Sequence, residues 1–343
     1  MSQNVTSRRL VEIDALRGVA AMAVVLFHFT TRFVELFHPA SLPSLSASRG
    51  HYGVNLFFII SGFVIFMTLE KTARPMDFVV SRFSRLFPAY WVAIALTFTL
   101  THLLGLPGKL VDLPTAMGNM VMLHGLFHVP HVDGVYWTLE VELLFYFGMF
   151  LLWRLGQLHR VHYALFALLA LRLIYFVLAQ GWGIELPWII SRLLILQYLP
   201  WFALGISVYR LASPASDGAW RWPALTALGA LTTLFIVESV FVGLLAMVLV
   251  VAVWLASMAR IAVLRYRVFV WLGSISYPLY LLHENIGWSI ELRVLALGAS
   301  VDLAIVVALV LVLALATALT RWVEQPAMRW IRSRYRQRLA LAV

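Results

Sequence analysis

Cysteine is absent from the 343 residues of this chain, and charged residues make up only 12% of it. The first absence excludes disulfide bonds, thiolate metal sites and a cysteine nucleophile, and it says nothing about the compartment. The second argues against an ordinary soluble protein, because soluble domains carry about 25% charged residues. Hydrophobic residues instead make up 62% of the chain, and the mean hydropathy is +0.89. Composition alone therefore indicates a multi-span membrane protein.

The hydrophobic residues fall into ten runs, each close to the roughly 20 residues that a helix needs to cross a bilayer. In the second half of the chain, the two runs on either side of Glu238 indicate a tight helical hairpin. We therefore predict an all-α integral membrane protein of about ten transmembrane helices. The predicted spans are 13–35, 52–70, 87–106, 137–154, 162–180, 188–210, 223–238, 240–258, 270–291 and 301–321.

The net charge of +10 is concentrated on one side of these spans. Nineteen of the 26 Lys and Arg residues lie in the connections and ends of that side, whereas the opposite connections hold Arg49, Lys109 and Arg293. The positive-inside rule then places both termini in the cytoplasm. The charge therefore reports orientation, and we expect no nucleic-acid partner.

The sequence shows no internal repeat, low-complexity segment or soluble second domain, so we predict a single transmembrane domain over 1–343. A cytoplasmic segment, 1–12, would precede the first span, and a basic cytoplasmic tail, 325–343, would follow the last. A cleavable signal peptide is the competing interpretation of the N-terminal region, because SLPSLSAS at 41–48 is similar to a cleavage region. The charged residues inside the first run argue against it, as does a length beyond the roughly 7–15 residues of a signal-peptide core.

Those charged residues are Arg17 and His28, eleven positions apart. In an α-helix this spacing gives a rise of roughly 16 Å and a rotation of only about 20°, so the two side chains share one face. Because the first span runs outward, Arg17 would lie near the cytoplasmic end and His28 in the outer part of the bilayer. Arg17 also has a simpler explanation, in which its charge merely reaches the cytoplasmic headgroups.

Other spans place polar residues at a depth similar to that of His28. Asn55 lies near the outer surface of the second span, and Glu142 lies about 8 Å below the outer boundary of the fourth. Tyr146 follows Glu142 by one turn on the same face, and His283 falls in the outer half of the ninth span. Because intramembrane ionisable groups are costly and mark functional paths, we predict that these residues converge on one outward-lying pocket. For His283 alone, a structural hydrogen bond between helices is as good an explanation.

The connection 107–136 holds His124, His128, His131 and Asp133, which approach the spacing of metal ligands. No fourth ligand is required by the pattern, and the segment resembles a loop, so we expect no metal site. Glu140 projects to another face of its span than Glu142, and we expect it at the membrane interface.

Five blocks of sequence resemble, in the same order, the membrane-bound acyltransferase family 3, the O-acyltransferases of bacterial surface glycans. VEQP at 323–326 is similar to the usual ending of that family, so the resemblance covers nearly the whole chain. The five blocks are EIDALRGVAAMAVVLFHF (12–29), GVNLFFIISGFVI (53–65), SRFSRLFPAYW (81–91), WTLEVELLFY (137–146) and ISYPLYLLHE (275–284).

The resemblance implies a multi-pass protein of the bacterial cytoplasmic (inner) membrane that moves an acyl group, most often acetyl, from cytoplasmic acyl-CoA to a hydroxyl of an extracytoplasmic or lipid-linked glycan. It implies His28 as the catalytic residue, Glu142 as an active-site carboxylate, and Arg17 and Arg85 as donor-site residues. Asn55 stands where many members carry Asp, so an acid role is not expected there. Exopolysaccharide and O-antigen both remain open as acceptors.

The residues suit this chemistry. A hydroxyl needs a base near neutral pH, and neutral His28 can take its proton. Glu142 would orient the imidazole and stabilise its cation, while Asn55, Tyr146 or His283 would stabilise the thioester oxyanion or contact the acceptor. The CoA phosphates would stay with Arg17, Arg82 and Arg85 on the cytoplasmic side.

The expected partners are therefore acyl-CoA, a glycan or lipid-linked saccharide, and membrane lipids, with acetyl-CoA as the donor substrate and no tightly bound cofactor. A secondary transporter of a charged or sugar-like solute is the main alternative, because transporters also bury His, Glu and Arg along a path. Their repeated halves are not visible here. A membrane-embedded glycan-binding or scaffold protein is the third possibility, and it would not need a His–Glu pair below the surface.

Overall fold

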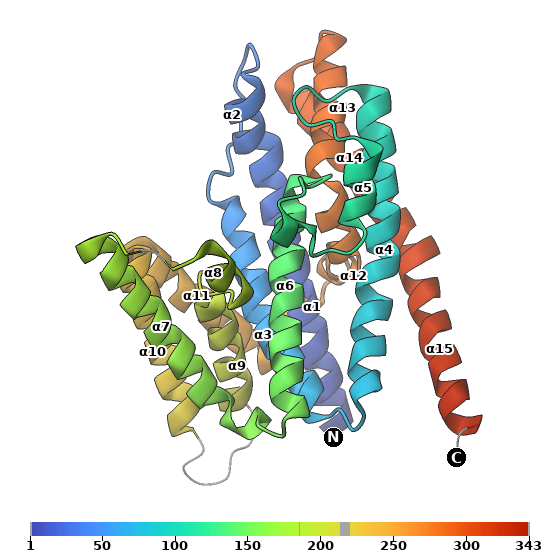
Figure 1. The fold of residues 1–343 in the computed structure, drawn as a ribbon. Coiled ribbons are helices and arrows are strands. Elements are labelled where there is room, and N and C mark those ends of the chain that lie inside the picture. The colour runs from blue at the N-terminus through green and yellow to red at the C-terminus, as the bar shows by residue number, and fades with distance from the viewer. Residues whose placement is uncertain (1, 185, 213–219, 342–343) are drawn as a thin grey trace. The chain divides into compact units, whose positions relative to one another are not determined.

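The computed structural model describes residues 2–184, 186–212 and 220–341, and its regular elements over these residues are all helices (Figure 1). Its short helices include the π-helices η1 (His28–Arg32) and η7 (Thr320–Glu324) and the 3₁₀-helices η3 (His124–Phe127) and η4 (Gly134–Tyr136). The α-helices are α1 (Ser2–Phe27), α2 (Phe33–Phe37), α3 (Gly53–Glu70), α4 (Pro75–Leu104), α5 (Leu113–Asn119), α6 (Trp137–Arg154), α7 (Val161–Trp182), α8 (Trp188–Leu193), α9 (Leu199–Ala212), α10 (Arg221–Val237), α11 (Val240–Ser257), α12 (Arg267–Leu282), α13 (Glu284–Ala296), α14 (Val301–Leu319) and α15 (Gln325–Leu341).

The all-α prediction is confirmed, and each of the ten predicted spans contains an apolar helix. Among the residues that the structure describes, seven helical stretches are long and apolar enough to cross a membrane, and three more apolar helices are shorter. The long stretches are Val11–Phe37, Gly50–Glu70, Pro75–Leu104, Gly134–Arg154, Leu158–Trp182, Val240–Ser257 and Val301–Leu341. The shorter helices are Leu199–Ala212, Arg221–Val237 and Arg267–Leu282. The number of helices that cross the bilayer therefore stays a prediction.

Two predicted spans are broken, and their prediction as continuous helices was wrong. The span 188–210 consists of α8 and α9, separated by a turn in which Ile195 has a φ of +48°. Pro200 helps to start α9 at this point, because proline fits the first turn of a helix and restricts the residue before it. The span 270–291 is interrupted at His283, between α12 and α13.

The described residues group into two compact units, each assembled from segments that are distant in the sequence. The first unit contains the described residues of 1–17, 55–73 and 141–270. The second contains those of 18–54, 74–140 and 271–343. The predicted single transmembrane domain thus holds two packing units.

The first unit is held by close contact between α3 and α9. A Cβ atom placed on Gly205 of α9 would overlap the carbonyl oxygen of Ile59 on α3, so the two backbones touch at this crossing. Phe202, which is fully buried, stacks against Phe145 of α6 with a ring distance of 4.0 Å. Small residues allow such close approach of helices in membranes, where packing replaces the hydrophobic effect as the driving force.

The second unit has its own core around Trp288 of α13. Phe33 and Leu106 form a buried cluster with this tryptophan. The indole N–H of Trp288 donates to the carbonyl of His28 at 2.9 Å, and the ammonium of Lys109 lies 5.6 Å from the ring centre. Trp288 therefore fixes the backbone at His28, the first residue of η1.

The contact between α3 and α9 predicts that Gly205→Ala destabilises the protein by about 1–3 kcal/mol, the usual cost of overpacking. Thermal unfolding in detergent, followed by size-exclusion chromatography, measures the effect. Gly148→Ala on α6 is the matched control, because a Cβ atom there meets open space and alanine is a better helix former than glycine. Equal melting temperatures for the two variants would contradict the assigned packing.

Candidate active site

His28 is the first residue of the π-helix η1, which continues directly from α1. A π-turn is wider than an α-turn and is frequent at functional sites. The Nδ1 atom of His28 lies 2.9 Å from the carbonyl oxygen of Val24 and 3.2 Å from Nε2 of His283. The predicted meeting of His28 and His283 is therefore found in the structure, within the second unit.

The hydrogen bonds assign the tautomer of both imidazoles. Nδ1 of His283 contacts the carbonyl of Tyr280 at 2.9 Å, so it carries a proton and leaves Nε2 of His283 as an acceptor. Nδ1 of His28 must likewise donate, because its contacts are the Val24 carbonyl and that acceptor nitrogen. The lone pair of neutral His28 is consequently on Nε2. This is the arrangement that a general base requires.

A carboxylate that the sequence analysis missed faces this nitrogen. Oε2 of Glu284 lies 3.3 Å from Nε2 of His28, and the two side chains are only 7% and 13% exposed. Poor access of water strengthens a charge interaction between them. Glu284 is therefore placed to stabilise the imidazolium that forms when His28 takes a proton. The signal was present in the sequence, because Glu284 ends the fifth family block, directly after His283.

The break between α12 and α13 places Glu284. The backbone N–H of Asn285 donates to Oδ2 of Asp133 at 3.1 Å, while the side-chain amide of Asn285 donates to the carbonyl of Val132 at 2.9 Å. Asp133 also accepts from the N–H of Val135 at 3.2 Å. These bonds satisfy the polar groups at the start of α13 and clamp the connection before α6 onto them.

Asp133 is fully buried in this clamp. Burial raises the pKa of the Asp133 carboxyl above its ordinary value, although the N–H groups of Asn285 and Val135 act in the opposite direction. Gly134 is required beside it, because a Cβ atom at this position would overlap the carboxylate of Glu284. Asp133, a candidate metal ligand by its spacing in the sequence, holds the backbone at the helix break in the structure.

Glu142 belongs to the first unit, where it links α3 with α6. Its Oε1 accepts hydrogen bonds from the hydroxyl of Ser61 at 2.8 Å and from that of Tyr146 at 2.5 Å. The prediction that Tyr146 shares a face with Glu142 is confirmed. Asn55 lies half-buried in the first turn of α3 in the same unit. The proposed site residues thus form two groups, one in each unit, and the predicted common pocket stays a prediction.

Glu140 was expected at the membrane interface, and that expectation was wrong. The residue is fully buried in the second unit, where its carboxylate lies against Gly125. The reason is the fold of the connection 107–136, which contains α5, η3 and η4 and covers this face of α6.

The histidines of this connection do not form the i, i+4 pair that their spacing in the sequence suggested. His124 contacts His131, with 2.6 Å between Nε2 and Nδ1, whereas the sequence spacing favoured His124 with His128. The residues after His124 form a 3₁₀-turn that ends at His128 in the left-handed region, so the i, i+4 geometry of an α-helix does not apply. Burial, with a smaller contribution from His131, lowers the pKa of His124 to about 4.

The predicted donor-site arginines lie in different surroundings. Arg17 pairs with Asp14 at 3.7 Å within the first unit. Arg82 and Arg85 lie on α4, where Arg82 stacks near Phe78. The described part of the basic tail forms the helix α15, and one arginine of this helix contacts α4.

That arginine is Arg332, which the sequence analysis counted only as an orientation charge. Its guanidinium donates to the hydroxyl of Ser84 at 3.1 Å and to the carbonyl of Ser81 at 3.2 Å. It therefore lies within electrostatic range of Arg82 and Arg85. Tyr335, one turn further along α15, donates to Asp77 at 2.8 Å and holds the two helices together. Like charges gathered in this way favour a multivalent anion.

The family model described as an acyltransferase domain, Acyl_transf_3, matches residues 10–321. "Protein 2 in picA locus" of Rhizobium radiobacter is 36% identical over 121 residues, which cover 33% of this chain and 58% of that protein. "Exopolysaccharide production protein ExoZ" of Rhizobium meliloti (strain 1021) is 31% identical over 124 residues, which cover 32% of this chain and 37% of that protein.

The chain thus spans less than two thirds of the length of either relative. No solved structure matches the chain. The family model, in contrast, extends from α1 to η7 and includes both groups of polar side chains described above. The chain therefore belongs to the acyltransferase family 3.

Proposed function

We propose that this protein is a membrane O-acyltransferase that moves an acyl group, most often acetyl, from cytoplasmic acyl-CoA to a hydroxyl of an extracytoplasmic or lipid-linked glycan. Family membership supports the reaction class. The printed name of one relative, an exopolysaccharide production protein, favours exopolysaccharide as the acceptor. The observation that carries the proposal is the buried contact between Nε2 of His28 and the carboxylate of Glu284.

In the proposed reaction, His28 is the general base. The acceptor hydroxyl attacks the thioester carbonyl carbon, and its proton passes to Nε2 of His28. The carbon–sulfur bond then breaks, and the CoA thiolate leaves and takes up the proton. Val24 and His283 hold the imidazole through Nδ1, while Glu284 stabilises the imidazolium in a site with little water.

The hydrogen bonds of Tyr146, His283 and Glu142 change the roles proposed for these three residues. Tyr146 donates its hydroxyl proton to Glu142, and neutral His283 has no proton on Nε2. Neither side chain is therefore placed to donate a hydrogen bond to a thioester oxyanion. Of the oxyanion candidates Asn55, Tyr146 and His283, the amide of Asn55 remains. Glu142 would serve as an active-site carboxylate that positions Ser61 and Tyr146, with Glu284 taking the part next to His28.

The donor is proposed to bind from the cytoplasm. The CoA phosphates would contact Arg82, Arg85 and Arg332, with Arg17 at the entrance beside the first span, so that only the acyl group crosses the hydrocarbon. In this proposal, the protein lies in the bacterial inner membrane. About ten transmembrane helices form one domain, and both termini are in the cytoplasm. Acetyl-CoA is a substrate in this proposal, and no tightly bound cofactor or metal takes part.

The reaction is tested in proteoliposomes that contain the purified protein, labelled acetyl-CoA on one side and unmodified polysaccharide on the other. Labelled ester on the polysaccharide is the expected result. Uptake of a solute without ester formation would instead favour a transporter, and binding of glycan without either would favour a scaffold.

We expect His28→Ala to lower acetyl transfer by about 10²–10⁴-fold, the usual contribution of a general base. Binding of acetyl-CoA, measured by filtration with the labelled donor, should stay unchanged, because the arginines hold the phosphates. His102→Ala is the matched control, since this exposed histidine of α4 bonds only a carbonyl of its own helix. Turnover near that of the control would remove His28 from the mechanism.

Glu284→Gln is expected to lower turnover by about 10²-fold with little change in the KM for acetyl-CoA, because an amide keeps the shape but cannot stabilise the imidazolium. The pH profile of kcat gives a second readout, since the rising acidic limb, on which His28 loses its proton, should shift when the neighbouring carboxylate is removed. Glu142→Gln provides the comparison. A larger effect of Glu142→Gln on the pH profile would return the partnership with His28 to Glu142.

Arg332→Ala should weaken acetyl-CoA binding by about tenfold, the order expected for one charge-assisted contact to phosphate. Arg338→Ala, an exposed arginine further along α15, is the control. The affinity is measured by competition of CoA against the labelled donor. If Arg332→Ala and Arg338→Ala bind alike, α15 has no part in the donor site.

A further inference from the structure

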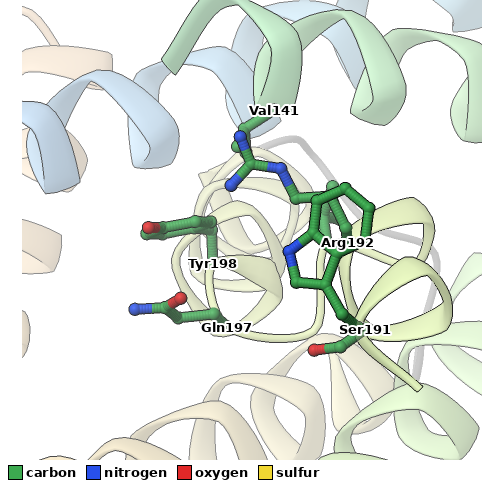
Figure 2. Close-up of a pocket in the computed structure, with 7 residues that line it drawn as sticks. Val141, Ser191, Arg192, Gln197 and Tyr198 are labelled. Atoms are coloured by element: carbon green, nitrogen blue, oxygen red, sulfur yellow. The ribbon is translucent and has the colours of Figure 1, made fainter. Parts of the chain in front are cut away.

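The first unit contains a pocket that has no role in the reaction proposed above. It measures about 100 Å³ and lies where the turn between α8 and α9 packs against α6. Figure 2 shows the guanidinium of Arg192 beside Val141, with the polar ends of Tyr198 and Gln197 directed to the same side of the view as that guanidinium. Trp188, Ser191 and Ile195 complete the lining.

The lining combines aromatic faces with hydrogen-bonding groups of several kinds. Trp188 and Tyr198 offer flat apolar surfaces with a polar edge. Arg192 offers a planar fork of donors, Gln197 both a donor and an acceptor, and Ser191 a hydroxyl. A sugar ring has the matching chemistry, because its faces carry C–H groups and its rim carries hydroxyls. A pocket this small, well below the roughly 300 Å³ of an ordinary ligand site, holds at most a single ring of a ligand and not a whole chain.

The backbone of this pocket is strained. Ile195 is buried and adopts a φ of +48°, in the left-handed region that a β-branched residue rarely enters. Such strain persists only where the surrounding structure enforces it, and it is frequent at ligand sites. Here the strained turn ends α8, starts α9 and directs Gln197 and Tyr198 into the pocket wall. An unbroken helix over 188–210 would have no such wall.

The pocket shares helices α3 and α6 with the hydrogen bonds of Glu142. Val141 forms its wall on α6, and the next residue is Glu142, which holds Ser61 and Tyr146. Tyr198 packs against Phe58 of α3 with a ring distance of 5.3 Å, one turn before Ser61. In the proposed topology, the connection from α7 to α9 and the start of α6 are both at the outer face, where a surface glycan is found.

We propose that the pocket of Trp188, Ser191, Arg192, Gln197 and Tyr198 binds a sugar ring of the acceptor glycan. The proposal rests on the function proposed above and adds the acceptor subsite to it. It assigns Trp188 to the ring face, and Arg192 and Gln197 to the ring hydroxyls. These residues determine which acceptor is used, and they take no part in the chemical step.

The test uses polysaccharide purified from cells that lack this chain, because this material is the unmodified acceptor. In proteoliposomes with labelled acetyl-CoA, Trp188→Ala, Arg192→Gln and Gln197→Ala should each raise the KM for polysaccharide by about tenfold, the loss of one good contact. The KM for acetyl-CoA should not change. Trp182→Ala and Gln180→Ala, two exposed residues at the end of α7, are the matched controls and should keep both values.

The absence of cysteine allows a second measurement that does not depend on turnover. Gln197→Cys supplies a unique thiol at an exposed position, and polysaccharide should slow its reaction with a maleimide in detergent. The same polysaccharide should leave a Gln180→Cys thiol unaffected.

The two proposals fail differently. If the wild-type protein forms no ester on the polysaccharide, the proposed function is wrong. If it does, but the three pocket variants behave like the controls and Gln197→Cys is not protected, the acceptor subsite is wrong while the function stands. A dependence of the variants on anionic lipid content, with an unchanged KM for polysaccharide, would identify a lipid headgroup site and overturn the inference.

Discussion

A buried carboxylate beside a partly buried histidine is the constraint on which the second unit depends. Taking Glu284 out of water is costly, and only a close partner and satisfied hydrogen bonds make it tolerable. His28 supplies that partner when its imidazole is protonated, with Nε2 3.3 Å from Oε2 of Glu284. Trp288 and Val24 hold the backbone and ring of His28 in turn. Much of the local architecture, from the π-turn of η1 to the helix break at His283, serves to bring these two side chains together.

Broken helices recur at the places that carry polar chemistry. An apolar surrounding cannot hydrogen-bond the free N–H and C=O groups of a helix end, so each break needs internal partners. At the start of α13, Asp133 provides one by accepting from the N–H of Asn285. Between α8 and α9, the turn at Ile195 closes on its own backbone, where the N–H of Leu199 donates to the Ile195 carbonyl at 2.9 Å. Each break points side chains into a site that an unbroken helix would direct along its surface.

The arginines illustrate how one kind of residue serves two purposes. As a sum, the basic residues predict which side of the protein faces the cytoplasm. Individually, Arg332 is fixed on α4 by Ser81 and Ser84, which gives a guanidinium a defined place near Arg82 and Arg85. A residue that only satisfied the positive-inside rule would not need these bonds. Composition reveals the first purpose, and packing reveals the second.

The sequence by itself determined the all-helical class and the apolar runs, and it singled out His28 as a candidate, because hydrophobicity and helical spacing are local properties. It also placed Tyr146 beside Glu142, since residues four apart share a helix face. Tertiary structure alone decided that Glu284 faces His28, that Glu140 is buried and that Arg332 reaches α4. Each of these depends on contacts between residues far apart in the chain, or on a helix break that hydrophobicity conceals. A run of apolar residues is the same whether its helix continues or stops, and only the partners around the break decide which occurs.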